Sequence, residues 1–73
     1  MAVCNVRRVL EVLVKAGFEL DRQKGPHRTF KGTVNEHIQC VQVSFHRESD
    51  DIKPKTLASI IRQSGLAKDL FRR

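Results

Sequence analysis

The sequence predicts a single α+β domain that spans residues 1–73, in which two helices cover one face of a three-stranded antiparallel sheet and leave the other face open. Apolar residues recur at three- and four-residue steps near both ends of the chain, which is typical of amphipathic helices. Between these segments apolar and polar residues alternate, as they do in half-buried strands. Glycine and proline stand between the segments and mark their expected boundaries.

Near the start of the chain, the sequence predicts a helix from Val6 to Ala16, with Asn5 as its N-cap. Gly17 follows and supplies the left-handed residue that ends many helices. One side of this helix carries an apolar stripe that consists of Val6, Val9, Leu10 and Leu13. We expect this stripe to face the sheet.

The next stretch predicts two strands joined by a tight turn. Residues 18–24 are expected to form a half-buried first strand, with Phe18 and Leu20 on one side and Glu19 and Asp21 on the other. Gly25-Pro26 is a typical turn sequence, because proline fixes its own φ and biases the preceding residue away from helical geometry.

The second strand is expected over residues 28–31, where Phe30 is the only large apolar side chain and therefore faces the core. Counting with a period of two then places Thr29, and His27 if the strand extends that far, on the open face. Residues 32–37 are expected to form a mobile polar loop.

Residues 38–45 carry the strongest strand pattern of the chain. The expected core side of this strand consists of Val41, Val43 and Phe45. Ile38 and Cys40 then lie on the open face, where we expect cover from a partner or from the C-terminal tail.

A charged loop over residues 46–53 precedes the second helix, which is expected from Pro54 to Ser64 because proline suits the first turn of a helix. The expected inward side of this helix consists of Leu57, Ala58, Ile60 and Ile61. Gly65 ends the helix, and residues 66–73 form a tail that either adds one more turn or frays.

The chain is basic, with 14 Lys and Arg against 8 Asp and Glu, which gives a net charge of +6. This excess favours a polyanionic partner such as nucleic acid, although a basic surface can also serve solubility alone. The chain has no apolar run near ~20 residues and no secretory signal pattern, so we expect a cytoplasmic protein without a membrane partner. Cys4 and Cys40 are expected to be reduced, with a disulfide or thiol chemistry as the alternative.

The tight turn places His27 among Arg22, Lys24 and Arg28. An imidazole can accept or donate a proton near neutral pH, and neighbouring cations can hold a phosphate and stabilise the charge that develops on it. RNA carries its own nucleophile, the 2′-hydroxyl, so a base that removes this proton would cleave the strand without a metal ion. The alternative is an ordinary surface histidine beside a turn.

The other charged groups give weaker indications. His37 is expected in solvent, whereas His46 would approach the open face at the end of the third strand. The histidines and cysteines lack the spacing of a metal site and no cofactor motif occurs, so we expect neither a metal nor a cofactor. The acidic residues interpreted as a solvated loop before a helix are Glu48, Asp50 and Asp51. The cations that either extend a basic surface or simply face solvent are Lys53, Lys55, Arg62 and Lys68.

The order of helix, three strands and helix matches double-stranded RNA-binding domains, although a fold alone does not define a function. Two blocks of the sequence, in the same order and spacing, resemble the HicA family of toxin mRNA interferases. The matching residues are Leu13 to Phe18, Arg22-Gln23-Lys24-Gly25, His27 and Phe30 in the first block, and Ile52 to Leu57 and Ile60 to Leu66 in the second. The resemblance covers about residues 6–66.

This resemblance implies a double-stranded RNA-binding-like fold, metal-independent cleavage of mRNA that arrests translation and growth, and neutralisation by a HicB-type antitoxin. The family's catalytic histidine falls on His27, and His46 lies near a histidine that the family often has after strand three. The phosphate-binding residues expected around the catalytic histidine are Arg22, Lys24, Arg28 and Lys31. Gly25 matches the family pattern, but Pro26 replaces the usual serine, which removes a hydroxyl and a backbone N–H.

Two other interpretations of the sequence stay open. A non-catalytic RNA-binding module would use the same charge and fold without histidine chemistry. A protein-interaction domain would offer its basic face to an acidic partner and would show no salt-dependent affinity for RNA.

Overall fold

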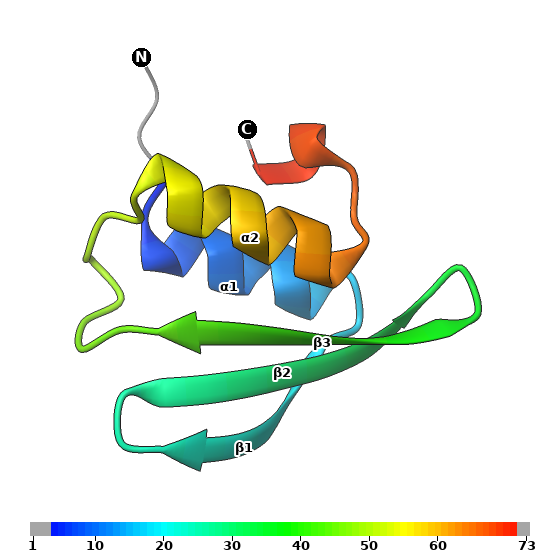
Figure 1. The fold of residues 1–73 in the computed structure, drawn as a ribbon, viewed down its shortest axis with the longest axis horizontal. Helices are drawn as coiled ribbons and strands as arrows, with labels where there is room; N and C mark the ends of the chain where they lie inside the picture. Colours follow the sequence, from blue (N-terminus) through cyan, green and yellow to red (C-terminus); the bar gives the residue numbers. More distant parts are fainter. Residues whose placement is uncertain (1–3, 72–73) are drawn as a thin grey trace.

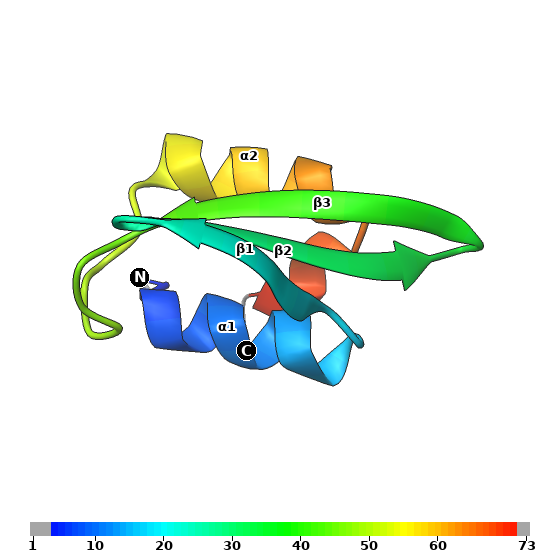
Figure 2. The ribbon, with the colours of Figure 1, turned by 90° about the horizontal axis from the view of Figure 1, so that it is seen from below.

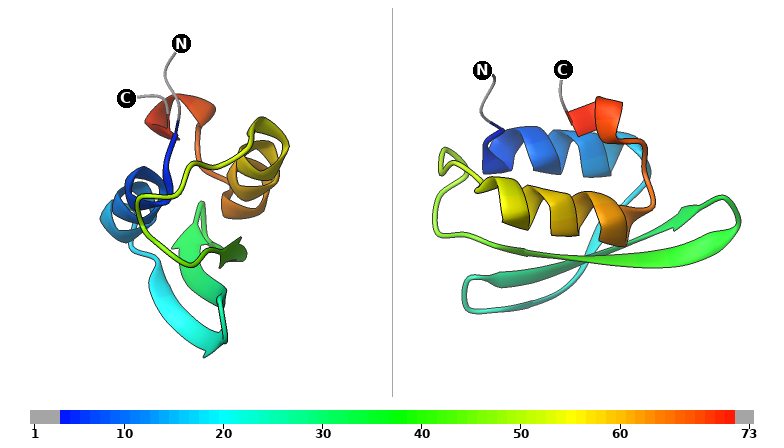
Figure 3. Two further views of the ribbon diagram at one scale, coloured as in Figure 1. Left: turned by 90° about the vertical axis from the view of Figure 1, so that its left-hand side faces the viewer. Right: turned by 45° about the horizontal axis from the view of Figure 1, so that its top comes forward.

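The computed structural model describes residues 4–71, and its elements follow the predicted order (Figure 1). The elements are α1 (Val6–Lys15), β1 (Glu19–Lys24), β2 (His27–Val34), β3 (His37–Ser44), α2 (Pro54–Ser64) and the short 3₁₀ helix η1 (Lys68–Phe71). The strands form one antiparallel sheet in the order β1-β2-β3, and both helices lie on one of its faces (Figure 2, Figure 3). The predicted fold class is therefore confirmed. Residues 72–73 of the expected tail lie outside the described residues.

Helix α1 begins where its capping residue predicts. The side-chain oxygen of Asn5 accepts a hydrogen bond of 2.9 Å from the backbone N–H of Arg8, which satisfies one free donor of the first turn. After the helix, Gly17 has a φ of 92°, in the region that favours glycine. Val12 is buried in addition to the predicted stripe, because η1 packs against this helix.

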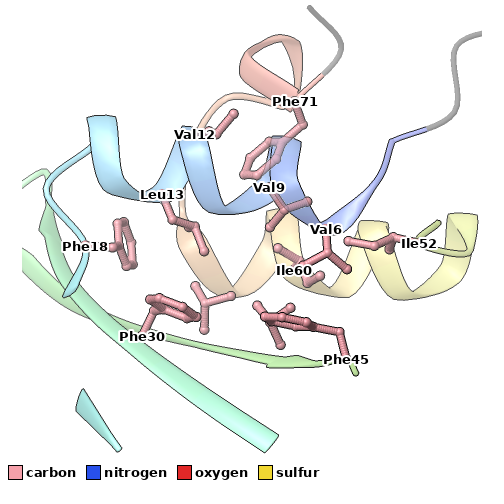
Figure 4. Close-up of a cluster of buried hydrophobic side chains, with 12 residues drawn as sticks. Val6, Val9, Val12, Leu13, Phe18, Phe30, Phe45, Ile52, Ile60 and Phe71 are labelled. Carbon is pink, nitrogen blue, oxygen red and sulfur yellow. The ribbon is translucent and has the colours of Figure 1, made fainter. Parts of the chain in front are cut away.

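The hydrophobic core lies between the helices and the sheet (Figure 4). Its buried side chains are Val6, Val9, Val12, Leu13, Phe18, Phe30, Val41, Val43, Phe45, Ile52, Ile60 and Phe71. Strand β1 contributes none of them, because all six of its residues are exposed. Within residues 4–71, no helix is long and apolar enough to cross a membrane.

The third strand has the predicted core side, and α2 has the predicted bounds. On the open face Ile38 is 66% exposed, and the C-terminal η1 packs on α1 and leaves this face uncovered. The prediction that Ala58 faces inward is wrong, since this residue is exposed whereas Ile60 is buried. Two residues of a helix differ by about 200° around its axis, so these two side chains point to opposite sides.

Strands β2 and β3 are joined by a two-residue turn at Asn35 and Glu36, so the mobile loop predicted over residues 32–37 is wrong. Strand β2 continues to Val34 and pairs with β3 along its whole length. The turn residues have φ values of 51° and 67°, the left-handed conformation that type I′ hairpin turns require. The turn was not predicted because the usual sequence signal for it is Asn-Gly, and here glutamate follows the asparagine.

Strand β1 contains a β-bulge that the alternating pattern did not predict. Its register with β2 shifts between Leu20 and Arg22, so Asp21 is the extra residue. Leu20 pairs with the buried Phe30, so it lies on the same side as Phe18, as predicted, but its side chain is 50% exposed and the strand is not half-buried as expected. The physical reason is that β1 is an edge strand outside the packed core.

Candidate functional site

The bulge in β1 determines which cations share a face with His27. Strict alternation from the buried Phe18 would direct the side chains of Arg22 and Lys24 toward the helices. The extra residue reverses this parity, and the observed pairs are Arg22 with Thr29 and Lys24 with His27. Directly opposite residues of an antiparallel pair share a face, so both cations lie on the open face with the histidine.

His27 and Ser44 lie directly opposite each other, at the first position of β2 and the last position of β3. Their side chains form a hydrogen bond in which Ser44 Oγ lies 2.6 Å from His27 Nδ1. A hydroxyl can donate to a bare ring nitrogen or accept from a protonated one. His27 is exposed, and among the described residues no hydrogen-bond partner occupies its Nε2 atom. That nitrogen is therefore available to a ligand on the open face.

Contacts between the β1–β2 turn and the end of β3 hold the backbone beside this pair, and the two segments lie at the same end of the sheet (Figure 1). The N–H of Phe45 donates to the carbonyl of Pro26 at 3.2 Å. Arg28 donates from Nη1 to the carbonyl of Phe45 at 3.3 Å, and its guanidinium carbon lies 4.0 Å from the centre of that ring. Arg28 is half-buried opposite the core residue Val43, so it lies on the other face from the histidine.

Two cations border the histidine on the open face. Lys24 lies directly opposite His27, and Arg22 lies two residues earlier in β1 with 81% of its side chain exposed. The nearest carboxylate to this arginine is that of Asp21, whose Oδ2 lies 3.6 Å from Arg22 Nε. An exposed ion pair of this kind contributes little and leaves the arginine free to bind an anion.

Lys31 lies farther along β2, about 13 Å from the start of the strand. It stands opposite Glu19 in β1 and Cys40 in β3, so a carboxylate-bearing residue lies directly across from it. Both cysteines are free, and Cys40 is exposed. Burial raises the pKa of the Cys4 thiol, an effect that the positive charge of Arg8 opposes. The Cys4 thiol is therefore protonated at neutral pH, which does not favour thiol chemistry there.

The other histidines do not join this group. His46 is exposed in a bend two residues after Ser44, and His37 begins β3 at the opposite end of the sheet. Across the part of the chain that the structure describes, no three His, Cys, Asp or Glu side chains are placed to hold a metal ion. The arrangement therefore centres on one imidazole with its hydroxyl partner and two cations.

The acidic loop before α2 acts through its backbone. The N–H of Val6 donates to the carbonyl of Asp50, and the N–H of Arg7 donates to the carbonyl of Glu48, both at 2.9 Å. These bonds satisfy donors at the start of α1 that have no partner within the helix. The Asp50 carboxylate accepts a hydrogen bond of 3.1 Å from the N–H of Arg47. The loop therefore has a structural role.

Ser44 is the residue of this group that the sequence interpretation missed. Its place opposite His27 follows from the register of β2 and β3, which the turn at residues 35–36 fixes. Counting outward from that turn pairs Val34 with His37 and ends on the histidine and the serine. The polar loop predicted between the strands concealed this register.

The α-β-β-β-α order, with both helices on one face of an antiparallel sheet, defines the class of double-stranded RNA-binding-like domains. A comparison with protein families matches residues 6–66 to the family described as HicA toxin of bacterial toxin-antitoxin. This match covers most of the chain, so the chain belongs to the HicA toxin family, as the resemblance predicted. It is accordingly a toxin of a toxin–antitoxin system, with an antitoxin as partner. No curated protein matches the chain significantly.

Proposed function

We propose that this toxin is an endoribonuclease that cleaves mRNA without a metal ion and uses His27 as its proton acceptor and donor. The observation that carries the proposal is an exposed imidazole on a basic sheet face, with Nδ1 bonded to Ser44 and Nε2 open. The net charge of +6 attracts a polyanion such as RNA to the protein. The bulge then concentrates part of this charge beside the histidine.

The proposed reaction is an attack by RNA on its own backbone. Nε2 of His27 takes the proton of a 2′-hydroxyl, and the 2′-oxygen forms a bond to the adjacent phosphorus. The bond between phosphorus and the 5′-oxygen of the next nucleotide breaks, and that oxygen takes a proton from the imidazolium or from solvent. The products are a 2′,3′-cyclic phosphate and a free 5′-hydroxyl.

The cations of the open face would bind the phosphates around the scissile bond. Lys24 lies opposite His27 and would supply a compact positive charge to the reacting phosphate. Arg22 can bind a phosphate through two parallel hydrogen bonds. Lys31 would contact the RNA strand farther along the open face of the sheet. Arg28, in contrast, supports the end of β3 from the core side.

Cleavage of mRNA would stop translation and growth, which is the effect expected of a toxin in the cytoplasm. A HicB-type antitoxin would neutralise the enzyme by covering the open face of the sheet. The helices of the toxin lie on the other face and leave this surface accessible (Figure 2). The same accessibility that admits RNA would therefore admit the antitoxin.

The test is cleavage of RNA by purified protein in EDTA. The His27→Ala variant should lose at least roughly 100-fold of the cleavage rate, because the proton acceptor is removed. The matched control is His37→Ala, which removes an exposed histidine at the other end of the sheet and should cleave like the wild type. Unfolding midpoints of both variants should stay close to that of the wild type, since neither side chain is buried and the exposed hydrogen bond from His27 to Ser44 contributes at most about 1 kcal/mol.

Three outcomes separate the possible functions. Full cleavage by the His27→Ala protein would exclude the histidine mechanism. Binding of RNA without cleavage by the wild type would favour the non-catalytic module. Affinity for RNA that is absent, or that does not depend on salt, would favour the protein-interaction domain.

A further inference from the structure

We propose that Ser44 is a positioning residue for His27, supplying from β3 the hydroxyl contact that the turn next to the histidine cannot supply. The inference rests on the proposed ribonuclease function. Pro26 has neither a hydroxyl nor a backbone N–H, so the residue just before the histidine offers the imidazole no donor. Ser44 Oγ lies 2.6 Å from Nδ1 and provides a hydroxyl partner for the imidazole from the facing strand.

The contact is built into the register of the sheet. His27 and Ser44 are direct partners across β2 and β3, and serine has a short side chain that loses little conformational entropy when it is held. The hydrogen bond from Phe45 N–H to the Pro26 carbonyl joins the segments that flank the pair. Two backbone segments that are fixed to each other therefore hold the two side chains within bonding distance.

The hydroxyl suits both protonation states of the imidazole. When Nδ1 carries the proton, it donates to Ser44 Oγ, and Nε2 keeps the lone pair that a base needs. After Nε2 accepts the proton of the 2′-hydroxyl, Nδ1–H still donates to the same oxygen. When Nε2 alone is protonated, the hydroxyl turns and donates to Nδ1. Ser44 can thus follow the proton without movement of the ring.

This bond also restricts where the reactive nitrogen lies. An exposed histidine without a partner rotates about two side-chain torsions and presents either nitrogen to solvent. With Nδ1 held by Ser44, only Nε2 is presented to RNA, beside Lys24. The cations bind the RNA, whereas Ser44 orients the imidazole that accepts the proton. Loss of the serine should therefore lower kcat and change KM little.

The first measurement compares Ser44→Ala with Ser44→Thr in RNA cleavage. The alanine variant should lose about ten-fold in kcat, the size expected for one hydrogen bond to a group that becomes charged. The threonine variant keeps the hydroxyl in a strand position that suits β-branched residues, and it should restore most of the rate. A loss confined to KM, or an equal loss in both variants, would overturn the positioning role.

The second measurement uses the free protein and does not depend on activity. The ¹⁵N chemical shifts of the His27 ring report which nitrogen carries the proton, and they should move toward those of an unrestrained histidine in Ser44→Ala but not in Ser44→Thr. Unchanged shifts in the alanine variant would show that the serine does not hold the ring. If the wild type fails to cleave RNA, the proposed function fails, while these shifts still decide whether Ser44 controls the imidazole.

Discussion

Gly32 and Phe18 share one space on the core side of the sheet. A Cβ atom at position 32 would lie 2.7 Å from Cγ of the Phe18 ring, which is closer than non-bonded carbon atoms approach. Phe18 is only 2% exposed, and it is the buried side chain that precedes the exposed strand β1. The absence of a side chain at position 32 therefore lets the ring fasten the junction of α1 and β1 to the core.

We expect Gly32→Ala to lower the free energy of unfolding by about 1–3 kcal/mol, because the added methyl group overpacks the site. Urea denaturation would measure the change, with the exposed neighbour Thr33→Ala as the control. The double variant Phe18→Leu/Gly32→Ala should recover part of the loss, since contacting residues are not additive. An unchanged midpoint for Gly32→Ala would contradict this account of the contact.

The turn of the β2–β3 hairpin has Glu36 at its second position, where type I′ turns prefer glycine. Glu36 has a φ of 67°, where an L side chain crowds the backbone and glycine does not. The turn nevertheless fixes the register of both strands, and through the register it brings His27 and Ser44 together. Strain at one end of the hairpin is thus linked to the arrangement of the site at the other end.

The variant Glu36→Gly should raise the free energy of unfolding by about 0.5–1 kcal/mol, because relief of the crowded conformation exceeds the entropy cost of glycine. Thermal or urea unfolding would measure the gain. Glycine at the strand position Thr33 is the matched control and should be destabilising, because that residue is extended. A less stable Glu36→Gly protein would show that the turn does not have the proposed strain.

The elements with a long apolar repeat could be predicted, whereas features that depend on one residue could not. The bounds of α2 followed from its repeat and from Pro54. The bulge at Asp21 has no side-chain signature, and a strict period of two would place Arg22 and Lys24 on the face opposite to the observed one. His27 was identified from its neighbours in the sequence, but Ser44 required a register between distant residues.

At the scale of the molecule, residues 4–71 form two layers, and within these residues the helices pack on one face of the sheet (Figure 3). The net charge of +6 belongs to the entire chain and would attract any polyanion from a distance. The location of the RNA-binding surface depends instead on which cations lie near each other. The candidates are the open-face pair Arg22 and Lys24, and the pair Lys53 and Lys55 at the start of α2.

These two pairs allow a comparison at equal charge. If single-stranded RNA lies along the open face, Arg22→Gln/Lys24→Gln should weaken the salt dependence of binding. The negative slope of log affinity against log salt should become less steep by about 0.7 for each lost phosphate contact. Lys53→Gln/Lys55→Gln removes the same charge from the helical layer and should weaken binding less, with little change in slope. The His27→Ala background prevents cleavage during a fluorescence titration over a series of salt concentrations. If the two double variants lose the same amount of RNA affinity, binding depends on the net charge alone. That result would contradict the open face as the binding surface.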